Sequence, residues 1–238
     1  SSAASDVYKR QGGGNVGANR EVCQMIKNAG TTPVTHFTVI KNTKEGIKEQ
    51  LDQYLADGVD HMLALRGDIP LGETTTCGDF DYATDLVKFV RDTYGDKFEI
   101  AVAGSPEGHI SCRSLESDIA VLKQKQDNGA DYIMTQLCWD MEQFKYWLDA
   151  IRKAGITMPV DVGVMPILDQ AATINMALSR NGCVMDSELC RLISRNWLFP
   201  NPFNAKDADG KPFDMFYEDK VKPVSYTHLR AHETSQDL

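Results

Sequence analysis

The amino-acid sequence predicts an α/β fold in which a parallel β-sheet alternates with helices, arranged as a (β/α)8 barrel (TIM barrel). Two observations support this prediction. Nearly continuous apolar runs recur roughly every 30 residues, as is typical of parallel strands buried on both faces. Between these runs lie amphipathic segments with helical periodicity, several of which end at a glycine.

The five apolar runs are the expected strands, and they span residues 34–40, 61–67, 98–104, 131–138 and 159–167. Strands and helices that alternate at this period fit either an open doubly wound sheet or a closed barrel. No G-x-G-x-x-G motif follows any run, which disfavours the dinucleotide-binding open sheet. A complete barrel typically needs about 250 residues. We therefore expect an incomplete barrel that lacks its first strand or strands and its last strand.

The helical segments carry apolar stripes that we assign to the core. The members of the first stripe are Ile47, Leu51, Tyr54 and Leu55, and those of the second are Phe144, Leu148 and Ile151. A capping box from Asp140 to Gln143 is expected to begin the helix of the second stripe. Glycines that suit left-handed caps lie at the expected helix ends: Gly58, Gly95, Gly129 and Gly155.

Both ends of the chain read as sequence that is foreign to the protein. Residues 1–11 (SSAASDVYKRQ) equal a translation of sequencing-adapter DNA, and residues 224–234 (VSYTHLRAHET) equal a translation of the companion adapter. A natural polar tail at each end is the alternative. We expect non-native segments at 1–11 and 224–238, and a partial barrel domain over 12–223.

Composition narrows the classes of function. The chain has 238 residues, of which 42% are hydrophobic, and its net charge is −9, which argues against a nucleic-acid partner or an anionic membrane. No apolar run approaches the roughly 20 residues of a membrane span. The six cysteines are scattered without a C-x-x-C pair, so we expect reduced thiols, a cytoplasmic location and no metal site.

Active sites of such barrels lie at the carboxyl ends of the strands, so polar residues there are the candidates. Arg66 and Asp68 flank Gly67 at the end of the second run, where they suit an anionic cofactor or form a structural ion pair. His36, in the first run, is either a ligand contact or a hydrogen-bonded core residue. Gln136, in the fourth run, needs a hydrogen-bond partner if it is buried.

Further polar candidates follow the third run. The loop AGSPEGHI contains Glu107 and His109. The next helix contains Asp118 and Lys125, which lie seven residues apart and so share one helix face. A solvated helix face is the ordinary meaning of such a pair. No serine triad or Walker loop is apparent in the sequence.

Taken in order, five motifs resemble those of methylenetetrahydrofolate reductases over residues 12–167. They are THFT with His36, ALRGD at 64–68, SPEGH at 105–109, NGADYIMTQ at 128–136 and GVMPI at 163–167. The resemblance implies a barrel that binds FAD across its mouth. NADH or NADPH reduces the flavin, and 5,10-methylenetetrahydrofolate then takes the same place and is reduced to 5-methyltetrahydrofolate.

The resemblance also implies roles for individual residues. The positions that match flavin contacts are His36, Arg66, Gly67, Asp68, Ala83, His109, Asp118 and Lys125. Arg66 and Lys125 would face the pyrophosphate, and Gln136 would hydrogen-bond folate and nucleotide in turn. Asp68 is the expected catalytic residue, because its carboxylate would stabilise cationic character on the folate. The general-acid Glu of the family lies on a strand that this chain does not contain, so we expect this chain to be inactive and its parent active.

Alternatives remain open beside this resemblance. The chain could belong to another flavin-binding TIM-barrel oxidoreductase with a different electron acceptor. It could also be a non-catalytic barrel that binds a phosphate-bearing ligand or a partner protein. The sequence does not choose between NADH, NADPH and a partner protein as electron donor, or between a parent that is a homo-oligomer and one that works with partner subunits.

Overall fold

The computed structural model describes residues 16–69, 74–165, 173–174, 183, 185 and 187–197. The segments 1–11 and 224–238, which we expected to be non-native, lie outside these residues. The chain divides into two compact units. The first comprises Ser1–Gly104, Ile119–Met134 and Arg152–Asp161, and the second comprises Ser105–Asp118, Thr135–Ile151 and Val162–Leu238.

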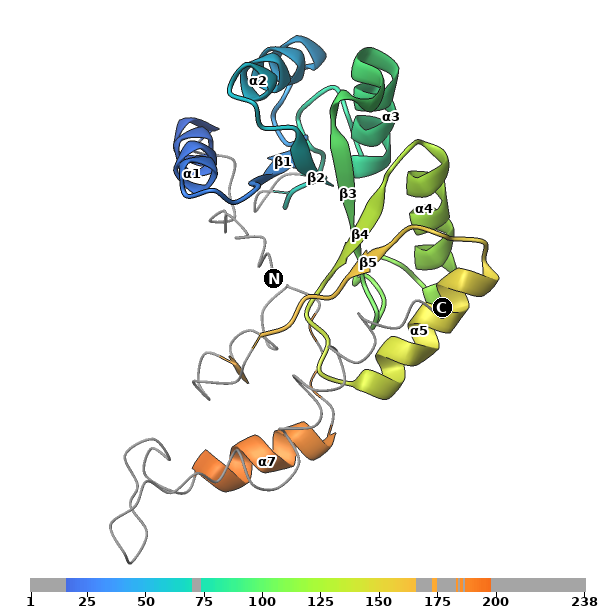
Figure 1. The fold of residues 1–238 in the computed structure, drawn as a ribbon. Coiled ribbons are helices and arrows are strands. Elements are labelled where there is room, and N and C mark those ends of the chain that lie inside the picture. The colour runs from blue at the N-terminus through green and yellow to red at the C-terminus, as the bar shows by residue number, and fades with distance from the viewer. Residues whose placement is uncertain are drawn as a thin grey trace, which may run out of the picture. The chain divides into compact units, whose positions relative to one another are not determined.

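One five-stranded sheet with the strand order β1-β2-β3-β4-β5 forms the centre of the first unit (Figure 1). Its strands are β1 (Val34–Thr38), β2 (His61–Leu65), β3 (Glu99–Gly104), β4 (Tyr132–Thr135) and β5 (Val160–Asp161). The pairs β1–β2, β2–β3 and β4–β5 are parallel. The structure thus confirms a strand within each of the five expected runs and the parallel α/β class, but β5 is short and residues 162–165 of the fifth run are not in a strand. The incomplete barrel stays a prediction, and residues 166–167 of the fifth expected strand lie outside the described part.

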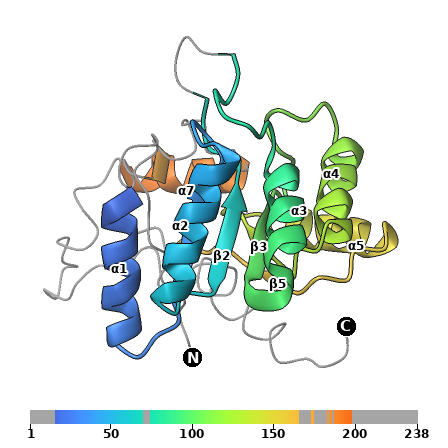
Figure 2. The same cartoon turned by 90° about the horizontal axis from the view of Figure 1, so that it is seen from above.

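Helices alternate with these strands along the chain. They are α1 (Val16–Asn28), α2 (Lys44–Ala56), α3 (Ala83–Tyr94), the short 3-10 helix η1 (Gly95–Lys97), α4 (Leu115–Asp127), α5 (Met141–Lys153) and α7 (Ser187–Trp197). Figure 2 shows α1, α2 and α3 side by side over one face of the sheet. Among the described residues, none of the helices combines the length and the apolar character that crossing a membrane requires.

Both faces of the sheet are apolar, as the continuous runs predicted. The helix-facing layer includes Phe37, whose ring meets the ring of Tyr54 on α2 edge to face with centroids 6.4 Å apart. Side chains of alternate residues form a cluster on the other face: Val34, Leu63, Ala101 and Tyr132, with Leu65 and Met134 packed against it. Because successive side chains of a strand point to opposite faces, this double burial requires apolar residues at nearly every position.

The predicted helix stripes are confirmed with one shift on α5, and with Leu55 of α2 only partly buried. Ile47, Leu51 and Tyr54 are buried on α2. On α5 the buried residues are Phe144, Trp147 and Ile151, whereas Leu148 is only partly buried. The four helix-ending glycines have positive φ, as expected: Gly58, Gly95, Gly129 and Gly155.

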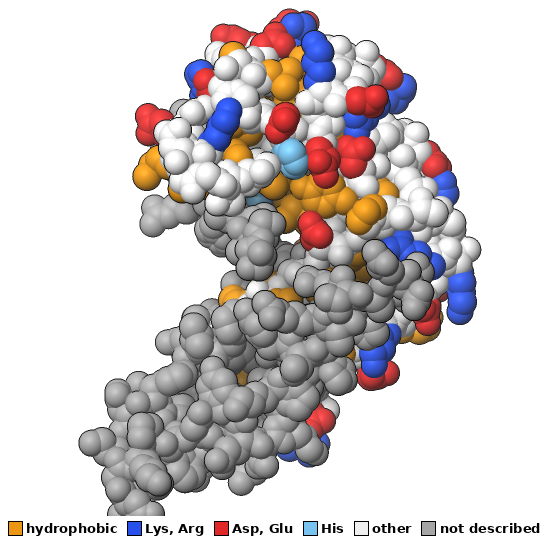
Figure 3. All heavy atoms as spheres, in the orientation of Figure 1, with side chains coloured by type: hydrophobic (Ala, Val, Ile, Leu, Met, Phe, Trp, Pro, Cys, Tyr) orange, Lys and Arg blue, Asp and Glu red, His pale blue; other side chains and the backbone are white. Residues whose placement is uncertain are grey.

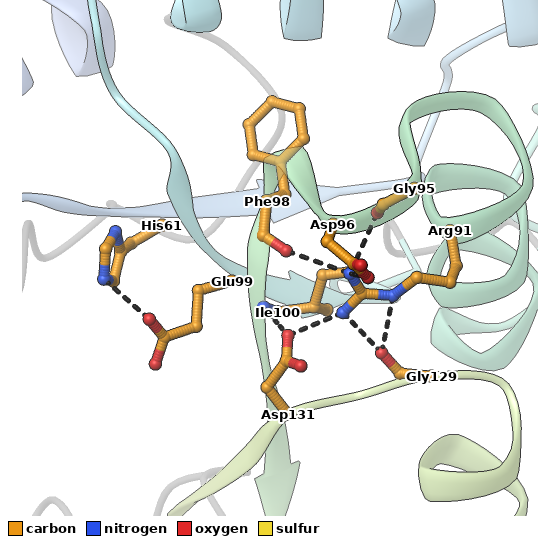
Figure 4. A network of polar contacts seen from close by, with 9 residues as sticks. All are labelled: His61, Arg91, Gly95, Asp96, Phe98, Glu99, Ile100, Gly129 and Asp131. Atoms are coloured by element: carbon orange, nitrogen blue, oxygen red, sulfur yellow. Dashed lines mark hydrogen bonds and ion pairs between the residues drawn. The ribbon is translucent and has the colours of Figure 1, made fainter.

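Hydrogen bonds from the side chain of Arg91 link the amino ends of β3 and β4 (Figure 4). Arg91, near the end of α3, donates from Nε and Nη2 to the carbonyl oxygen of Gly129 at 2.9 and 2.6 Å. Its Nη2 also donates to Oδ2 of Asp131 at 2.6 Å, and that oxygen accepts from the backbone N–H of Ile100 at 2.7 Å. Nη1 donates to the carbonyl oxygen of Phe98 at 3.2 Å. One side chain therefore fixes the end of a helix and the entry of two strands.

The surface follows the usual partition of charge. Figure 3 shows acidic and basic side chains interspersed over the described part of the visible face, with hydrophobic side chains in several patches among them. Salt bridges at i, i+4 spacing lie on exposed helix faces, among them Lys48–Asp52 and Lys88–Asp92. Exposed pairs of this kind contribute little to stability. The stability of the first unit therefore comes mainly from its apolar core and from the hydrogen bonds of Arg91.

Candidate functional site

The register of the sheet brings the carboxyl ends of three strands to one edge. Thr38 at the end of β1 pairs with Leu65 at the end of β2. Ala64 of β2 pairs with Val102, so the end of β3 lies level with the end of β2. In parallel α/β folds, ligands bind outside this edge of the sheet. The candidate residues of the first unit follow these strand ends.

The Arg66-Gly67-Asp68 segment leaves β2 at this edge. Gly67 has φ of +87°, and a Cβ added to it would lie 3.2 Å from Cβ of Thr38 and 3.2 Å from Cγ1 of Ile40. A larger residue here would be strained and crowded, which explains why the segment needs glycine. Asp68 is exposed and Arg66 is half-buried.

No salt bridge joins Arg66 to Asp68 within the described residues. Within the part of the chain that the structure describes, the Arg66 side chain donates one long hydrogen bond, from Nε to the carbonyl oxygen of Gly67 at 3.4 Å. The structural ion pair that the sequence left open is therefore not formed. A cation and a carboxylate are held at the exit of a buried strand without neutralising each other, which favours a binding role for both.

A further candidate of the first unit, Lys125, lies near the same edge. Lys125 on α4 donates from Nζ to the carbonyl oxygen of Ala103 at 2.9 Å. Ala103 is the second-to-last residue of β3. Arg66 and Lys125 thus place positive charge at the exits of neighbouring strands. Two such cations suit the two phosphates of a nucleotide cofactor better than a single phosphate.

His36 lies inside β1 and is half-buried. In the sheet it pairs with Leu63, so its side chain is on the face of the apolar cluster, and not on the face that the helices cover. Its carbonyl oxygen accepts a long hydrogen bond from Nδ2 of Asn19 at 3.5 Å. His36 therefore lies on the face of the apolar cluster, two residues before the end of β1. A ligand contact and a core role are both compatible with its burial.

Ala83 is the first residue of α3, and the residue before it was missed by the sequence analysis. Tyr82 is 60% exposed although it is a large aromatic residue. Its backbone N–H donates to Oδ2 of Asp85 at 3.0 Å, which fixes the helix start. An aromatic residue directly before a helix start in a polar loop was the available signal, and it offers a flat apolar surface for stacking.

The remaining candidates belong to the second unit. Oδ2 of Asp118, in the first turn of α4, accepts from the backbone N–H of His109 at 3.1 Å, so the structure brings these two candidates together. Nδ1 of His109 accepts from the backbone N–H of Ser111 at 3.2 Å. In a neutral imidazole this acceptor role places the proton on Nε2, which makes Nε2 a donor.

Side-chain hydrogen bonds also fix the backbone around Gln136 and in the loop that contains Glu107. Oε1 of Gln136 accepts from the backbone N–H of Leu137 at 2.9 Å. Oδ1 of Asp140 accepts from the N–H of Gln143 at 3.0 Å, which is one of the two bonds of the predicted capping box. The Gln143 amide donates to the carbonyl oxygen of Pro106 at 2.7 Å, which ties the loop after β3 to the start of α5.

Two buried thiols lie near Glu107. Burial raises the pKa of Cys138 to about 12, and the negative charge of Glu107 adds to the shift. Burial and the charge of Glu107 likewise raise the pKa of Cys183 to about 11. Both thiols are therefore neutral at physiological pH, and neither is an activated nucleophile. All six cysteines are unpaired by disulfides, as expected.

The candidate residues thus fall into two groups, one in each compact unit of the chain. The first unit contains His36, Arg66, Gly67, Asp68, Ala83 and Lys125, and the second contains His109, Asp118 and Gln136. Each group has residues that could contact an anionic or hydrogen-bonding ligand. On α4, Asp118 accepts a hydrogen bond from His109, and Lys125 donates one to Ala103.

Comparison with known proteins adds an independent finding. The family model described as methylenetetrahydrofolate reductase matches residues 3–189 of the chain. The match covers all the strands and the candidate residues described above. It begins inside the segment 1–11.

Individual relatives carry the same name. Methylenetetrahydrofolate reductase 1 of Schizosaccharomyces pombe is 42% identical over 135 residues, which are 56% of this chain and 22% of that protein. Methylenetetrahydrofolate reductase (NADH) 1 of Arabidopsis thaliana is 35% identical over 185 residues, 72% of this chain and 31% of that protein. The 5,10-methylenetetrahydrofolate reductase of Pectobacterium carotovorum is 33% identical over 160 residues, 65% of this chain and 52% of that protein. The chain therefore spans at most about half the length of these relatives.

Proposed function

Because the chain belongs to the methylenetetrahydrofolate reductase family, we propose that its parent enzyme reduces 5,10-methylenetetrahydrofolate to 5-methyltetrahydrofolate with electrons from NADH or NADPH and with FAD as cofactor. A bound flavin would supply hydride transfer between the nicotinamide and the folate. The names of the relatives support both nucleotides, since the plant protein is an NADH enzyme and one from Caenorhabditis elegans is a probable NADPH enzyme.

One structural observation carries the proposal. Arg66 and Asp68 stand unpaired with each other at the exit of β2, with Lys125 at the exit of the neighbouring strand β3. Two cations at adjacent strand ends fit the pyrophosphate of FAD, and Gly67 allows a close approach of the backbone. Tyr82 and Ala83 would line the same end of the unit. The residues present thus fit the cofactor.

The other residues take roles that follow from their chemistry. The Asp68 carboxylate is exposed, so it is free to stabilise positive charge that develops on the folate. Gln136 presents an amide that both donates and accepts, and it would bind the folate and the nicotinamide nucleotide in turn. Asp118 fixes the backbone of His109, and His109 would contact the flavin through its second nitrogen.

The test starts with flavin retention. The 238-residue chain is incubated with FAD, freed of unbound flavin by gel filtration and examined by visible spectroscopy. We expect retained flavin with absorption bands shifted from those of free FAD. Arg66→Met should weaken retention about tenfold, because it removes one charge-assisted contact to phosphate. Lys88→Met, which removes an exposed cation on α3, is the matched control.

Two further steps separate the enzyme from other flavin barrels. Anaerobic addition of NADH or NADPH should bleach the bound flavin, and methylenetetrahydrofolate should re-oxidise it in the full-length parent. Asp68→Asn in the parent should keep the flavin and slow the second step. Failure of the folded chain to retain any flavin, or re-oxidation that is indifferent to the folate, would count against the proposal.

A further inference from the structure

The loop between β2 and α3 begins with the Arg66–Asp68 segment. A later part of this loop is hydrogen-bonded to the loop after β1. We call residues 74–80 the anchor segment and residues 38–44 the platform. The backbone N–H of Lys41 donates to the carbonyl oxygen of Thr76 at 2.9 Å, and the N–H of Asp79 donates to the carbonyl oxygen of Asn42 at 3.1 Å. Oδ2 of Asp79 accepts from the N–H of Lys44 at 2.8 Å. Both backbone and side chain of the anchor segment therefore bind the platform.

The packing of this contact leaves little room for movement. A Cβ added to Gly78 would lie 2.6 Å from the carbonyl oxygen of Asn42 and 3.0 Å from that of Val39, so the two backbones are in direct contact. Thr76 is 2% exposed, and its hydroxyl donates to the carbonyl oxygen of Phe80 at 2.7 Å. The buried Phe80 ring packs against Phe89, with centroids 5.3 Å apart.

The same platform supports the start of the loop. Gly67 lies against Thr38 and Ile40, close enough that a Cβ would crowd both. The N–H of Val39 donates to the carbonyl oxygen of Leu65 at 3.2 Å, just before Arg66. The platform is braced internally, since Nδ2 of Asn42 donates to the carbonyl oxygen of Thr38 at 2.9 Å. The platform therefore lies between the anchor segment and the Arg66–Asp68 segment and contacts both.

We propose that Asp79 is a positioning residue for the Arg66-Gly67-Asp68 segment, an inference that rests on the function proposed above. Its carboxylate accepts the N–H of Lys44, in the first turn of α2, where the helix dipole favours negative charge. Its own backbone N–H donates to the carbonyl oxygen of Asn42. The platform is thereby fixed between α2 and the anchor segment, and Gly67 is held against a rigid surface. Without this contact, Arg66 and Asp68 would sample a wider range of positions.

The first experiment measures the affinity of the full 238-residue chain for FAD by flavin fluorescence. Asp79→Ala should raise Kd about tenfold, the change that loss of one hydrogen bond to a charged group produces. Asp79→Asn should stay near the wild type, because its amide oxygen still accepts from Lys44. Asp92→Ala, which removes an exposed carboxylate on α3, should leave Kd unchanged. An unchanged Kd in Asp79→Ala, or an equal loss in Asp92→Ala, would overturn the proposal.

The second experiment does not depend on flavin. Hydrogen–deuterium exchange with mass spectrometry compares peptides that cover residues 64–69 and 74–82 in the wild type and Asp79→Ala. Faster exchange in both peptides is expected, whereas a change confined to 74–82, or no change, would show that Asp79 does not position the first segment. If the wild type binds no FAD, the proposed function fails, and the exchange measurement still decides the role of Asp79.

Discussion

At the scale of single residues, Arg91 shows how one side chain stabilises several backbone turns. Its side chain is 19% exposed and reaches three carbonyl oxygens and the carboxylate of Asp131 within 3.2 Å. Lysine cannot reproduce this pattern, because an ammonium group lacks the planar fork of a guanidinium. We expect Arg91→Lys to lower the free energy of unfolding by about 2–3 kcal/mol. Urea unfolding measures the change, with Lys88→Ala as an exposed control. Equal midpoints for Arg91→Lys and the wild type would contradict this role.

At the scale of elements, the sequence predicted what depends on local patterns. The five apolar runs became strands, and the glycines became helix ends, because periodicity and left-handed caps are local properties. The buried residue of α5 was wrong by one position: Trp147 and Leu148 lie at i+3 and i+4 from Phe144, so both point to the same side, and only the packing chooses between them. The anchor segment was not predicted, since its bonds to the platform join loops about 35 residues apart.

The contact between α1 and α2 gives a prediction at this scale. Arg20 forms a salt bridge with Asp57 at the end of α2, and Lys27 on the next turns of α1 donates to the carbonyl oxygen of Asp57 at 2.7 Å. The hydrogen bond from Arg20 holds the pKa of Asp57 below its usual value. A lowered pKa stabilises the folded state above the unfolded pKa of about 3.9, and the contribution is lost as pH falls through the folded pKa.

The expected result is a gap in melting temperature between the wild type and Asp57→Asn that is full at pH 6 and shrinks below about pH 4. Thermal unfolding followed by circular dichroism from pH 7 to pH 3 measures it. Asp92→Asn, whose exposed carboxylate pairs only with Lys88, should show a smaller gap at every pH. A gap for Asp57→Asn that stays constant down to pH 3 would show that the charge of Asp57 does not stabilise the helix pair.

At the scale of the whole molecule, the sequence named candidate site residues, but it did not predict how their side chains are arranged. Motif order identified the candidates, and the register of the sheet explains why Arg66 and Lys125 lie at adjacent strand ends. Whether Arg66 and Asp68 form an ion pair could not be predicted from the sequence, because their spacing fits an ion pair as well as a binding site. The same holds for Asp118, which bonds the backbone of His109 and so shapes a loop.

Ligand binding should therefore appear as a change in global stability that depends on phosphate. A ligand that binds only the folded state at 100 times its Kd stabilises it by about 2.7 kcal/mol, or about 5–10 °C in melting temperature for a chain of this size. We expect FAD to produce such a shift and riboflavin, which has the same ring system without phosphates, to produce a much smaller one. Arg66→Met should reduce the difference between the two ligands, because it removes a cation that we propose to face the pyrophosphate, whereas Lys88→Met should preserve it. Equal shifts with FAD and riboflavin would mean that the ring system alone is recognised, and that the cations at the ends of β2 and β3 serve another purpose.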